Sequence, residues 1–322
     1  MKIHALCLVK NEADVLQETI ESALHWCDHI YIFDNGSSDG TWDLVKELAV
    51  QCPEIVPYKQ DDVLYCNSLR ADIFNAFRAK ARPQDWWCAL DADEFYIDDP
   101  RIFLAKIPDH FRTVWSASLN YYFTDRDAIE YEQNPEKFLK TPVQERLRYY
   151  CNNWGELRFF RHSDDIMWSI QDAGGFPPPM FSAPAYPVRI WLKHYQYRSP
   201  EQIERRLLTR RPAIQASTGF WHEFKPNWST AVATKRDGPL DFEDARPEFA
   251  GSRWEERMVP AVALDYDAFD RRYVVNESLM PKFPIRLPRS HLKAAIPQPV
   301  RAVLGRLRRQ ISMVLSGPQP NQ

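Results

Sequence analysis

Two aspartates separated by one residue are the strongest chemical signal in the sequence. Asp91 and Asp93 directly follow the apolar segment 86–90 (WWCAL), a run typical of a buried strand. Two carboxylates at this spacing in an extended chain can bind one divalent cation, and oxygen ligands favour Mg²⁺ or Mn²⁺. Carboxylates crowded at a strand end are costly unless a cation compensates them. We therefore expect a metal site here, of the kind that neutralises a departing diphosphate.

A second polar segment also ends an apolar run. Residues 29–34 (HIYIFD) are followed by NGSSDG, and a helical pattern opens at Thr41. Taken alone, this segment is well explained as a turn followed by a helix cap. Asp34 and Asp39 become candidates for ligand binding only in combination with the other motifs.

The elements that would position these residues alternate between strand and helix. Strands are predicted at 2–10, 29–34, 54–59, 86–90 and 113–123. Helices are predicted from an N-cap at Asn11, from Thr41, and over 67–80. This alternation favours an α/β fold with a mostly parallel sheet, helices on both faces and a ligand site at the carboxyl ends of the strands.

The chain divides into three predicted segments. Residues 1–125 form a Rossmann-like nucleotide-binding half, and 126–260, where the periodicity weakens, form an acceptor half of the same domain. In the extension 261–322, a proline-rich connector leads to a basic amphipathic helix at about 300–315, which we expect to contact a membrane surface peripherally. Residues 278–322 contain eight basic and no acidic residues, so the remaining 33 basic and 44 acidic residues carry a net charge of −11.

The composition of the chain limits the classes of protein to which it can belong. With 322 residues and 44% apolar content, the chain can bury a sizeable core, and its 11 Trp, 14 Tyr and 18 Phe offer stacking surfaces for a ring-shaped ligand. The six cysteines form no C-x-x-C pair, which favours reduced thiols over a zinc site or disulfides. The first apolar run is too short for a signal peptide, so we expect a cytoplasmic protein. With a net charge of −3, no nucleic-acid partner is expected.

Three segments together resemble a known family. LVKNE, FDNGSSDGT and ALDADEF, in this order within roughly the first hundred residues, resemble glycosyltransferase family 2 and its relatives of the GT-A fold. The resemblance implies a metal-dependent transferase that uses a nucleotide-diphosphate sugar as its donor, with a UDP-sugar favoured. In such an enzyme Asp34 contacts the base of the nucleotide. The resemblance also implies that the backbone of Val9 and Lys10 lines the same pocket and that Asp39 supports it.

The resemblance extends to the diphosphate and the metal. Arg70 resembles the family arginine that approaches the nucleotide or its diphosphate. Asp91 and Asp93 resemble the metal motif, with Asp93 the direct ligand. The segment HYQYRS at 194–199 resembles one that follows the acceptor region in such enzymes, so we expect His194, delivered by a strand at 188–192, to complete the Mn²⁺ or Mg²⁺ site.

The acceptor and the catalytic base are less well marked. An inverting transferase needs a carboxylate that deprotonates the attacking hydroxyl. Asp172 is the candidate chosen, because the family tends to place its base in a loop before the His194 segment; Asp164, Asp165 and Glu156 are alternatives. The acceptor is expected to be a glycan or a lipid-linked molecule.

Other classes of function remain as alternatives. A nucleotidyltransferase would need a glycine-rich basic first loop, whereas LVKNEADV contains no glycine. A dinucleotide oxidoreductase would need G-x-G-x-x-G after the first strand, which is missing. An inactive sugar-binding protein of the same fold is disfavoured by the retention of both Asp91 and Asp93.

Overall fold

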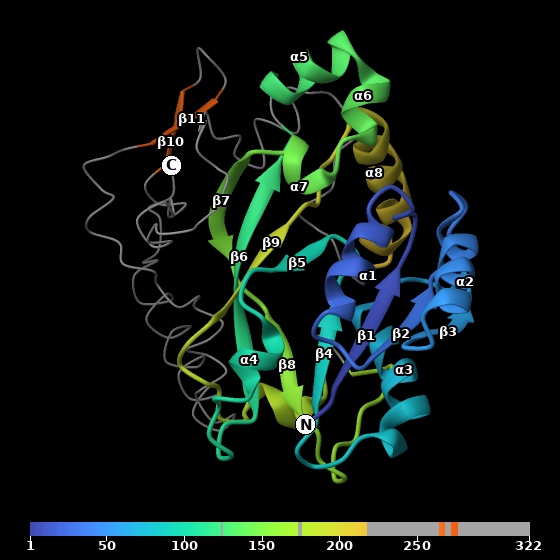
Figure 1. The fold of residues 1–322 in the computed structure, drawn as a ribbon, viewed down its shortest axis with the longest axis vertical. Helices are drawn as coiled ribbons and strands as arrows, with labels where there is room; N and C mark the ends of the chain where they lie inside the picture. The colour runs from blue at the N-terminus through green and yellow to red at the C-terminus, as the bar shows by residue number, and fades with distance from the viewer. Residues whose placement is uncertain (124, 173–175, 218–263, 268–271, 276–322) are drawn as a thin grey trace, which may run out of the picture.

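The computed structural model describes residues 1–123, 125–172, 176–217, 264–267 and 272–275. They form a curled mixed α/β sheet flanked by helices, as expected for a GT-A fold (Figure 1). The nine-stranded sheet has the order β3-β2-β1-β4-β8-β6-β9-β5, and β7 pairs with β6. The proline-rich connector and the basic helix expected near 300–315 lie outside the described residues.

The strands of the large sheet are β1 Ile3–Val9, β2 His29–Asp34, β3 Ile55–Gln60, β4 Trp86–Leu90, β5 Glu94–Tyr96, β6 Thr113–Tyr122, β7 Tyr149–Trp154, β8 Leu157–Arg161 and β9 Ile190–His194. The helices are α1 Leu16–Leu24, α2 Thr41–Gln51, α3 Arg70–Phe77, α4 Pro100–Leu104, α5 Asp125–Gln133, α6 Pro135–Lys140, α7 Val143–Arg146 and α8 Pro200–Gln215. A separate antiparallel pair is formed by β10 Leu264–Asp267 and β11 Arg272–Val275.

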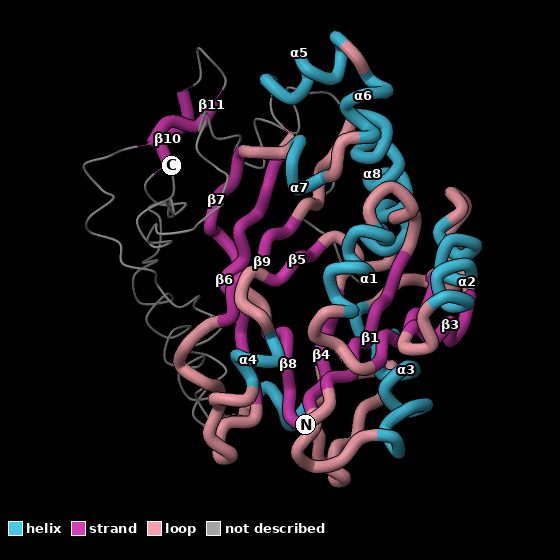
Figure 2. Tube along the Cα trace, in the orientation of Figure 1, coloured by secondary structure: helices cyan, strands magenta, loops and turns pink. Residues whose placement is uncertain are grey.

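The first half of the sheet has the predicted parallel pairing. Strands β1, β2, β3 and β4 run in one direction, with Val9 paired to Asp34 at the carboxyl ends of β1 and β2. The polar segments after β1, β2 and β4 therefore leave the same edge of the sheet, as the tube in Figure 2 shows for the loops that follow β1 and β4.

The second half of the sheet mixes directions. Strand β9 is parallel to β6, whereas β4–β8, β6–β8, β6–β7 and β5–β9 are antiparallel pairs. The short strand β5, which begins at Glu94, pairs with β9 so that Glu94 lies opposite His194. Strands from both sides of residue 125 thus join one sheet, and β9 returns the chain to the edge where β4 ends.

Alternating side chains of β1 pack against helices on opposite faces. Ile3, Ala5, Cys7 and Val9 join one core cluster that includes Leu16 and Ile20 of α1. Leu6 and Leu8 join another that includes Ile73 and Phe74 of α3. A strand buried on both faces requires this two-sided apolar pattern, which explains why residues 3–9 are apolar apart from His4.

One expected boundary is wrong. Helix α1 begins at Leu16, with Val15 rather than Asn11 in the N-cap position. Asn11 has a positive φ of 58°, and its side-chain Oδ1 accepts a hydrogen bond from the backbone N–H of Ser38 at 2.8 Å. Residues 11–15 form a loop because their polar side chains bind partners elsewhere in the chain.

Within the residues described above, the structure contains no helix that is long and apolar enough to cross a membrane.

Candidate functional site

The loops after β1 and β2 are held together by Asp39 and Asn11. Asp39 Oδ2 accepts from the backbone N–H of Ala13 at 3.2 Å, and Asp39 Oδ1 accepts from the N–H of Thr41 at 3.1 Å. The N–H of Asn11 donates to Ser37 Oγ at 2.8 Å. Asp39, which precedes the N-cap residue Gly40, therefore binds the first backbone N–H of α2 and also fixes the loop after β1.

Asp34 ends β2 and is fully buried. Its Oδ1 accepts from the backbone N–H of Ser37 at 2.7 Å and from Gln60 Nε2 at 3.2 Å. Its Oδ2 has no hydrogen-bond partner among the described residues. A buried carboxylate oxygen left unpaired is costly, so a ligand N–H donor would be stabilised there.

Val9 and Lys10 border the same segment. The carbonyl of Val9 accepts from the N–H of Asn35 at 2.8 Å. Lys10 Nζ forms an ion pair with Asp62 at 2.8 Å. Gly36, with a φ of +76°, passes so close to Asp62 that a Cβ would lie 2.5 Å from the Asp62 Cβ. The loop after β2 therefore packs tightly against the segment that follows β3.

Asp91 lies between two arginines. Arg70 from α3 donates to Asp91 Oδ1, and Arg158 Nη2 from β8 lies 3.1 Å from Asp91 Oδ2. The Arg158 guanidinium also pairs with Glu94 and, at 2.8 Å, with Glu156. Burial acts to raise the pKa of Asp91, but the charges of Arg158 and Arg70 hold it below its usual value.

Burial raises the pKa of Glu94 to about 8, despite the opposing charge of Arg158. Glu94 is fully buried, and its Oε2 lacks a hydrogen-bond partner within the described part of the chain.

Asp93 and His194 are brought together as neighbours. His194 ends β9, and its Nε2 lies 3.4 Å from Asp93 Oδ1. His194 Nδ1 lies 2.8 Å from Asn120 Oδ1 on β6, so Nδ1 carries the proton of that hydrogen bond and Nε2 faces Asp93. Burial alone would lower the pKa of His194, but the Asp93 carboxylate raises it above its usual value.

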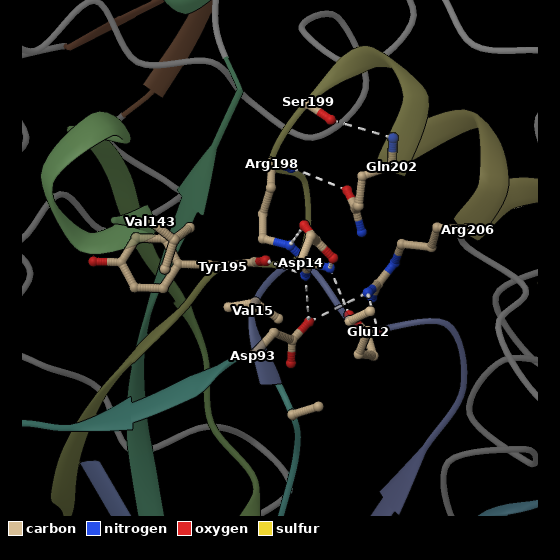
Figure 3. A network of polar contacts seen from close by, with 12 residues as sticks. Glu12, Asp14, Val15, Asp93, Val143, Tyr195, Arg198, Ser199, Gln202 and Arg206 are labelled. Carbon is tan, nitrogen blue, oxygen red and sulfur yellow. Dashed lines mark hydrogen bonds and ion pairs between the residues drawn. The ribbon is translucent and has the colours of Figure 1, made fainter. Parts of the chain in front are cut away.

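A buried ionic cluster surrounds the other oxygen of Asp93. Arg206 Nη1 lies 3.3 Å and Arg198 Nη1 3.7 Å from Asp93 Oδ2. Figure 3 shows Arg198, just before α8, and Arg206, within α8, both reaching toward Asp93 and Glu12. Although burial opposes ionisation, His194, Arg206 and Arg198 keep the pKa of Asp93 well below its usual value.

The metal-binding expectation can be tested on this donor set. Both oxygens of Asp91 are engaged by arginines, and no group of three or more His, Cys, Asp or Glu side chains suited to a metal occurs in the described residues. Asp93 Oδ1 and His194 Nε2 nevertheless face a common point, where Nε2 becomes a nitrogen ligand once a cation displaces its proton, and Asn120 orients the imidazole. These two residues can supply two of the ligands of a divalent cation.

Among the described residues, no hydrogen bond or ion pair links Asp172 to Asp91 or Asp93. Asp172 is half-buried and accepts from the backbone N–H of Ser169 at 2.7 Å, within its own loop. Asp164 and Asp165 likewise contact His162 and Ser163 nearby in the chain. The fourth candidate, Glu156, lies beside Asp91 through their shared partner Arg158.

Sequence reasoning identified Arg70, which pairs with Asp91, but missed Arg158, Arg198 and Arg206. Arg198 was present in the quoted HYQYRS segment and Glu12 in LVKNE, so both carried a signal. Arg158 stands in the segment LRFFR, where a charged residue between large apolar residues was the available clue. Arg206 belongs to an arginine pair in α8, which in sequence resembles an ordinary solvated helix face.

Comparison with known proteins assigns the chain to a family by sequence. The family model described as "Glycosyl transferase family 2" matches residues 7–167, which is half of the chain. No curated protein sequence matches the chain.

Solved structures with a similar arrangement are distant. A mannosyltransferase, PcManGT from Pyrobaculum calidifontis in complex with GDP-Man and Mn²⁺, is 13% identical with a TM-score of 0.34, over 68% of this chain and 65% of that one. S. aureus TarS 1–349 is 13% identical with a TM-score of 0.33, over 69% and 68%. GalNAc-T7 with UDP, GalNAc and Mn²⁺ is 13% identical with a TM-score of 0.37, over 65% and 47%. The match thus spans less than two thirds of the mannosyltransferase and of GalNAc-T7.

Proposed function

This chain belongs to glycosyl transferase family 2, and we propose that it transfers a sugar from a nucleoside-diphosphate donor, preferably a UDP-sugar, to a hydroxyl group of its acceptor. The observation that carries the proposal is the convergence of three sequence motifs at one edge of the sheet. Asp34 ends β2, Asp91 and Asp93 follow the parallel strand β4, and β9 returns His194 to the same edge.

Asp34 is proposed to recognise the nucleotide base. Its unpaired Oδ2 is an obligate acceptor, and the imide N–H of uracil is a donor that would satisfy it. The backbone of Val9 and Lys10 lines the same pocket, and Asp39 holds the two loops that form it.

Asp93 and His194 are proposed to hold Mn²⁺ or Mg²⁺ together with the donor diphosphate. The cation would supply positive charge to the leaving diphosphate. Arg70 and Arg158 keep Asp91 ionised and fixed beside this position, so Asp91 contributes to the donor site through its charge.

Asp172 is proposed as the base of an inverting displacement. The acceptor hydroxyl attacks the anomeric carbon from the face opposite the diphosphate, and the carboxylate of Asp172 takes its proton. The acceptor is proposed to be a glycan or a lipid-linked molecule at the cytoplasmic face of a membrane, with the basic segment at 300–315 providing peripheral contact.

Calorimetric titration with UDP and GDP, in Mn²⁺ and in EDTA, tests the proposal. We expect UDP to bind in Mn²⁺, and Asp93→Asn to remove the Mn²⁺ enhancement because an amide loses the charge that holds the cation. Asp34→Ala should weaken UDP binding by roughly tenfold without changing the effect of EDTA. Asp109→Asn is the matched control, since Asp109 is fully exposed at the surface.

Two results would contradict the proposal. Binding of neither nucleotide to the wild-type protein would remove the donor assignment. Equal Mn²⁺ enhancement in Asp93→Asn and in the wild type would remove the metal assignment.

A further inference from the structure

The proposed base pocket is closed in this structure. Asp34 has no exposed surface, and its Oδ2, the acceptor proposed for the base, is buried without a hydrogen-bond partner among the described residues. The next residue, Asn35, is also buried, and its Oδ1 lacks a partner within the same part of the chain. Two buried acceptors without donors are costly, so this arrangement favours an opening that admits a donor. A nucleobase can reach Asp34 only after a segment that covers it has moved.

The chain that follows β3 lies against these two residues. The backbone N–H of Asp61 donates to the carbonyl of Asp34 at 2.9 Å. Asn35 Nδ2 donates to the carbonyls of Asp61 at 3.1 Å and of Val63 at 2.8 Å. The segment that must move to expose Asp34 is therefore the one that begins at Asp61.

Segment 61–64 buries little of its own surface. It belongs to no helix or strand, and Asp62, Val63 and Leu64 are all exposed. Local opening costs least where few apolar side chains are buried. This segment can therefore open while β2 and β3 remain paired.

One ion pair ties the segment to the loop after β1. Lys10 Nζ lies 2.8 Å from Asp62 Oδ1, and the two side chains are 26% and 77% exposed. Asp62 also packs against Gly36, where an added Cβ would lie 2.5 Å from the Asp62 Cβ. Asp62 thus touches both loops that border Asp34. Because an ion pair this exposed stabilises only weakly, it can break and form again readily.

We propose that residues 61–64 form a lid over the base pocket and that the Lys10–Asp62 ion pair is its latch. This inference rests on the proposed function, because it needs a nucleotide base at Asp34. The latch breaks before the base enters, and it forms again when the lid closes over the bound base. It therefore slows the entry and the exit of the nucleotide equally, so it changes rates and leaves the affinity nearly the same.

Stopped-flow binding of UDP with a fluorescent label on its ribose, in Mn²⁺, measures these rates. Asp62→Ala removes the latch and keeps the Cβ that meets Gly36. We expect its association and dissociation rate constants both to rise by about two- to fivefold, as suits a weak ion pair. The dissociation constant should stay within about twofold of the wild-type value. Asp43→Ala is the matched control, because Asp43 is also 77% exposed and pairs with Lys46 at 2.7 Å on α2.

Lys10→Gln separates the latch from electrostatic steering. Loss of a positive charge lowers the association rate of an anionic ligand, whereas loss of the latch raises it. We expect a rise of about twofold or more, and no further rise when Lys10→Gln is combined with Asp62→Ala. A higher dissociation constant with an unchanged association rate would show that Lys10 contacts the ligand, and it would overturn the latch.

Hydrogen exchange tests the lid without any nucleotide. The N–H of Asp61 loses its bond to the Asp34 carbonyl when the lid opens. By mass spectrometry, a peptide that covers residues 60–66 should therefore exchange faster in Lys10→Gln than in the wild type. Lys46→Gln, which breaks the exposed pair on α2, should leave this exchange unchanged.

The outcomes distinguish the two proposals. If the wild type binds neither UDP nor GDP, the proposed function and this inference both fail. If the wild type binds UDP, but Asp62→Ala and Lys10→Gln leave the association rate constant unchanged, the inference alone fails. Equal exchange of residues 60–66 in Lys10→Gln and the wild type would likewise overturn the latch and leave the proposed function standing.

Discussion

Arg198 provides the sharpest test of how α8 is held on the domain. Its guanidinium is fully buried and pairs with Asp14 at 2.8 Å and with Glu12 at 2.5 Å. Replacement by Met keeps much of the apolar stem but leaves both carboxylates without this cation. Breaking a buried ion pair from one side costs about 3–5 kcal/mol, because the remaining charge is uncompensated. Asp14 is partly exposed and recovers some hydration, so we expect a loss of about 3 kcal/mol in the free energy of unfolding.

The loss should depend on pH in a definite direction. Burial already raises the pKa of Glu12, and Arg198 is the strongest influence that opposes the rise. Without Arg198, the pKa of Glu12 in the folded state rises further above its value in the unfolded state. The folded variant then keeps stability at low pH, where Glu12 is protonated, and loses it as the pH rises.

Urea denaturation of Arg198→Met and wild type at about pH 5 and pH 8 measures both effects. The difference in unfolding free energy should be larger at the higher pH. Arg148→Met is the control, because the Arg148–Glu130 pair is far more exposed and should contribute less than about 1 kcal/mol. A loss below about 1 kcal/mol for Arg198→Met, or one that is equal at both pH values, would refute this account of the cluster.

Two further predictions concern the sheet and its loops. Burial lowers the pKa of His4 to about 4, so the folded state takes up a proton later than the unfolded state as the pH falls. Between about pH 7 and pH 5, the free energy of unfolding of the wild type should therefore fall by about 2 kcal/mol more than that of His4→Phe, measured by urea denaturation. If the free energies of unfolding of the two proteins change in parallel with pH, the burial of a neutral His4 is contradicted. Gly36→Ala should destabilise the protein more than Gly40→Ala in thermal denaturation, because both glycines have positive φ but only a Cβ at Gly36 meets Asp62. Equal losses would mean that backbone strain alone matters.

The first half of the fold could be predicted because its signals are local. Segment 86–90 forms β4 and segment 29–34 forms β2 with the expected bounds, since each apolar run ends in a polar residue. The helix from Thr41 is also confirmed. The start of α1 was not predictable in this way. Glu12 and Asp14 leave the helix because they bind Arg198, which lies 186 and 184 residues further along the chain.

The second half depends on pairings that local periodicity does not encode. Strand β5 has only three residues and acquires its place by pairing with β9. Its first residue, Glu94, is buried although it is charged, because Arg158 from β8 comes to meet it. No pattern within either segment indicates the partner, so the mixed directions of this half follow from tertiary contacts alone.

The charges of the site change the argument for a metal. The crowding of Asp91 and Asp93 at a strand end led us to expect a compensating cation, and in the structure arginines already compensate them. The cost of burying two carboxylates therefore does not by itself require a metal ion. The pair formed by Asp93 Oδ1 and His194 Nε2 is the remaining support for a cation, because Asn120 holds the Nδ1 proton and leaves Nε2 directed at the carboxylate. It follows that the effect of EDTA on UDP binding should disappear in Asp93→Asn, because an amide loses the charge that holds the cation.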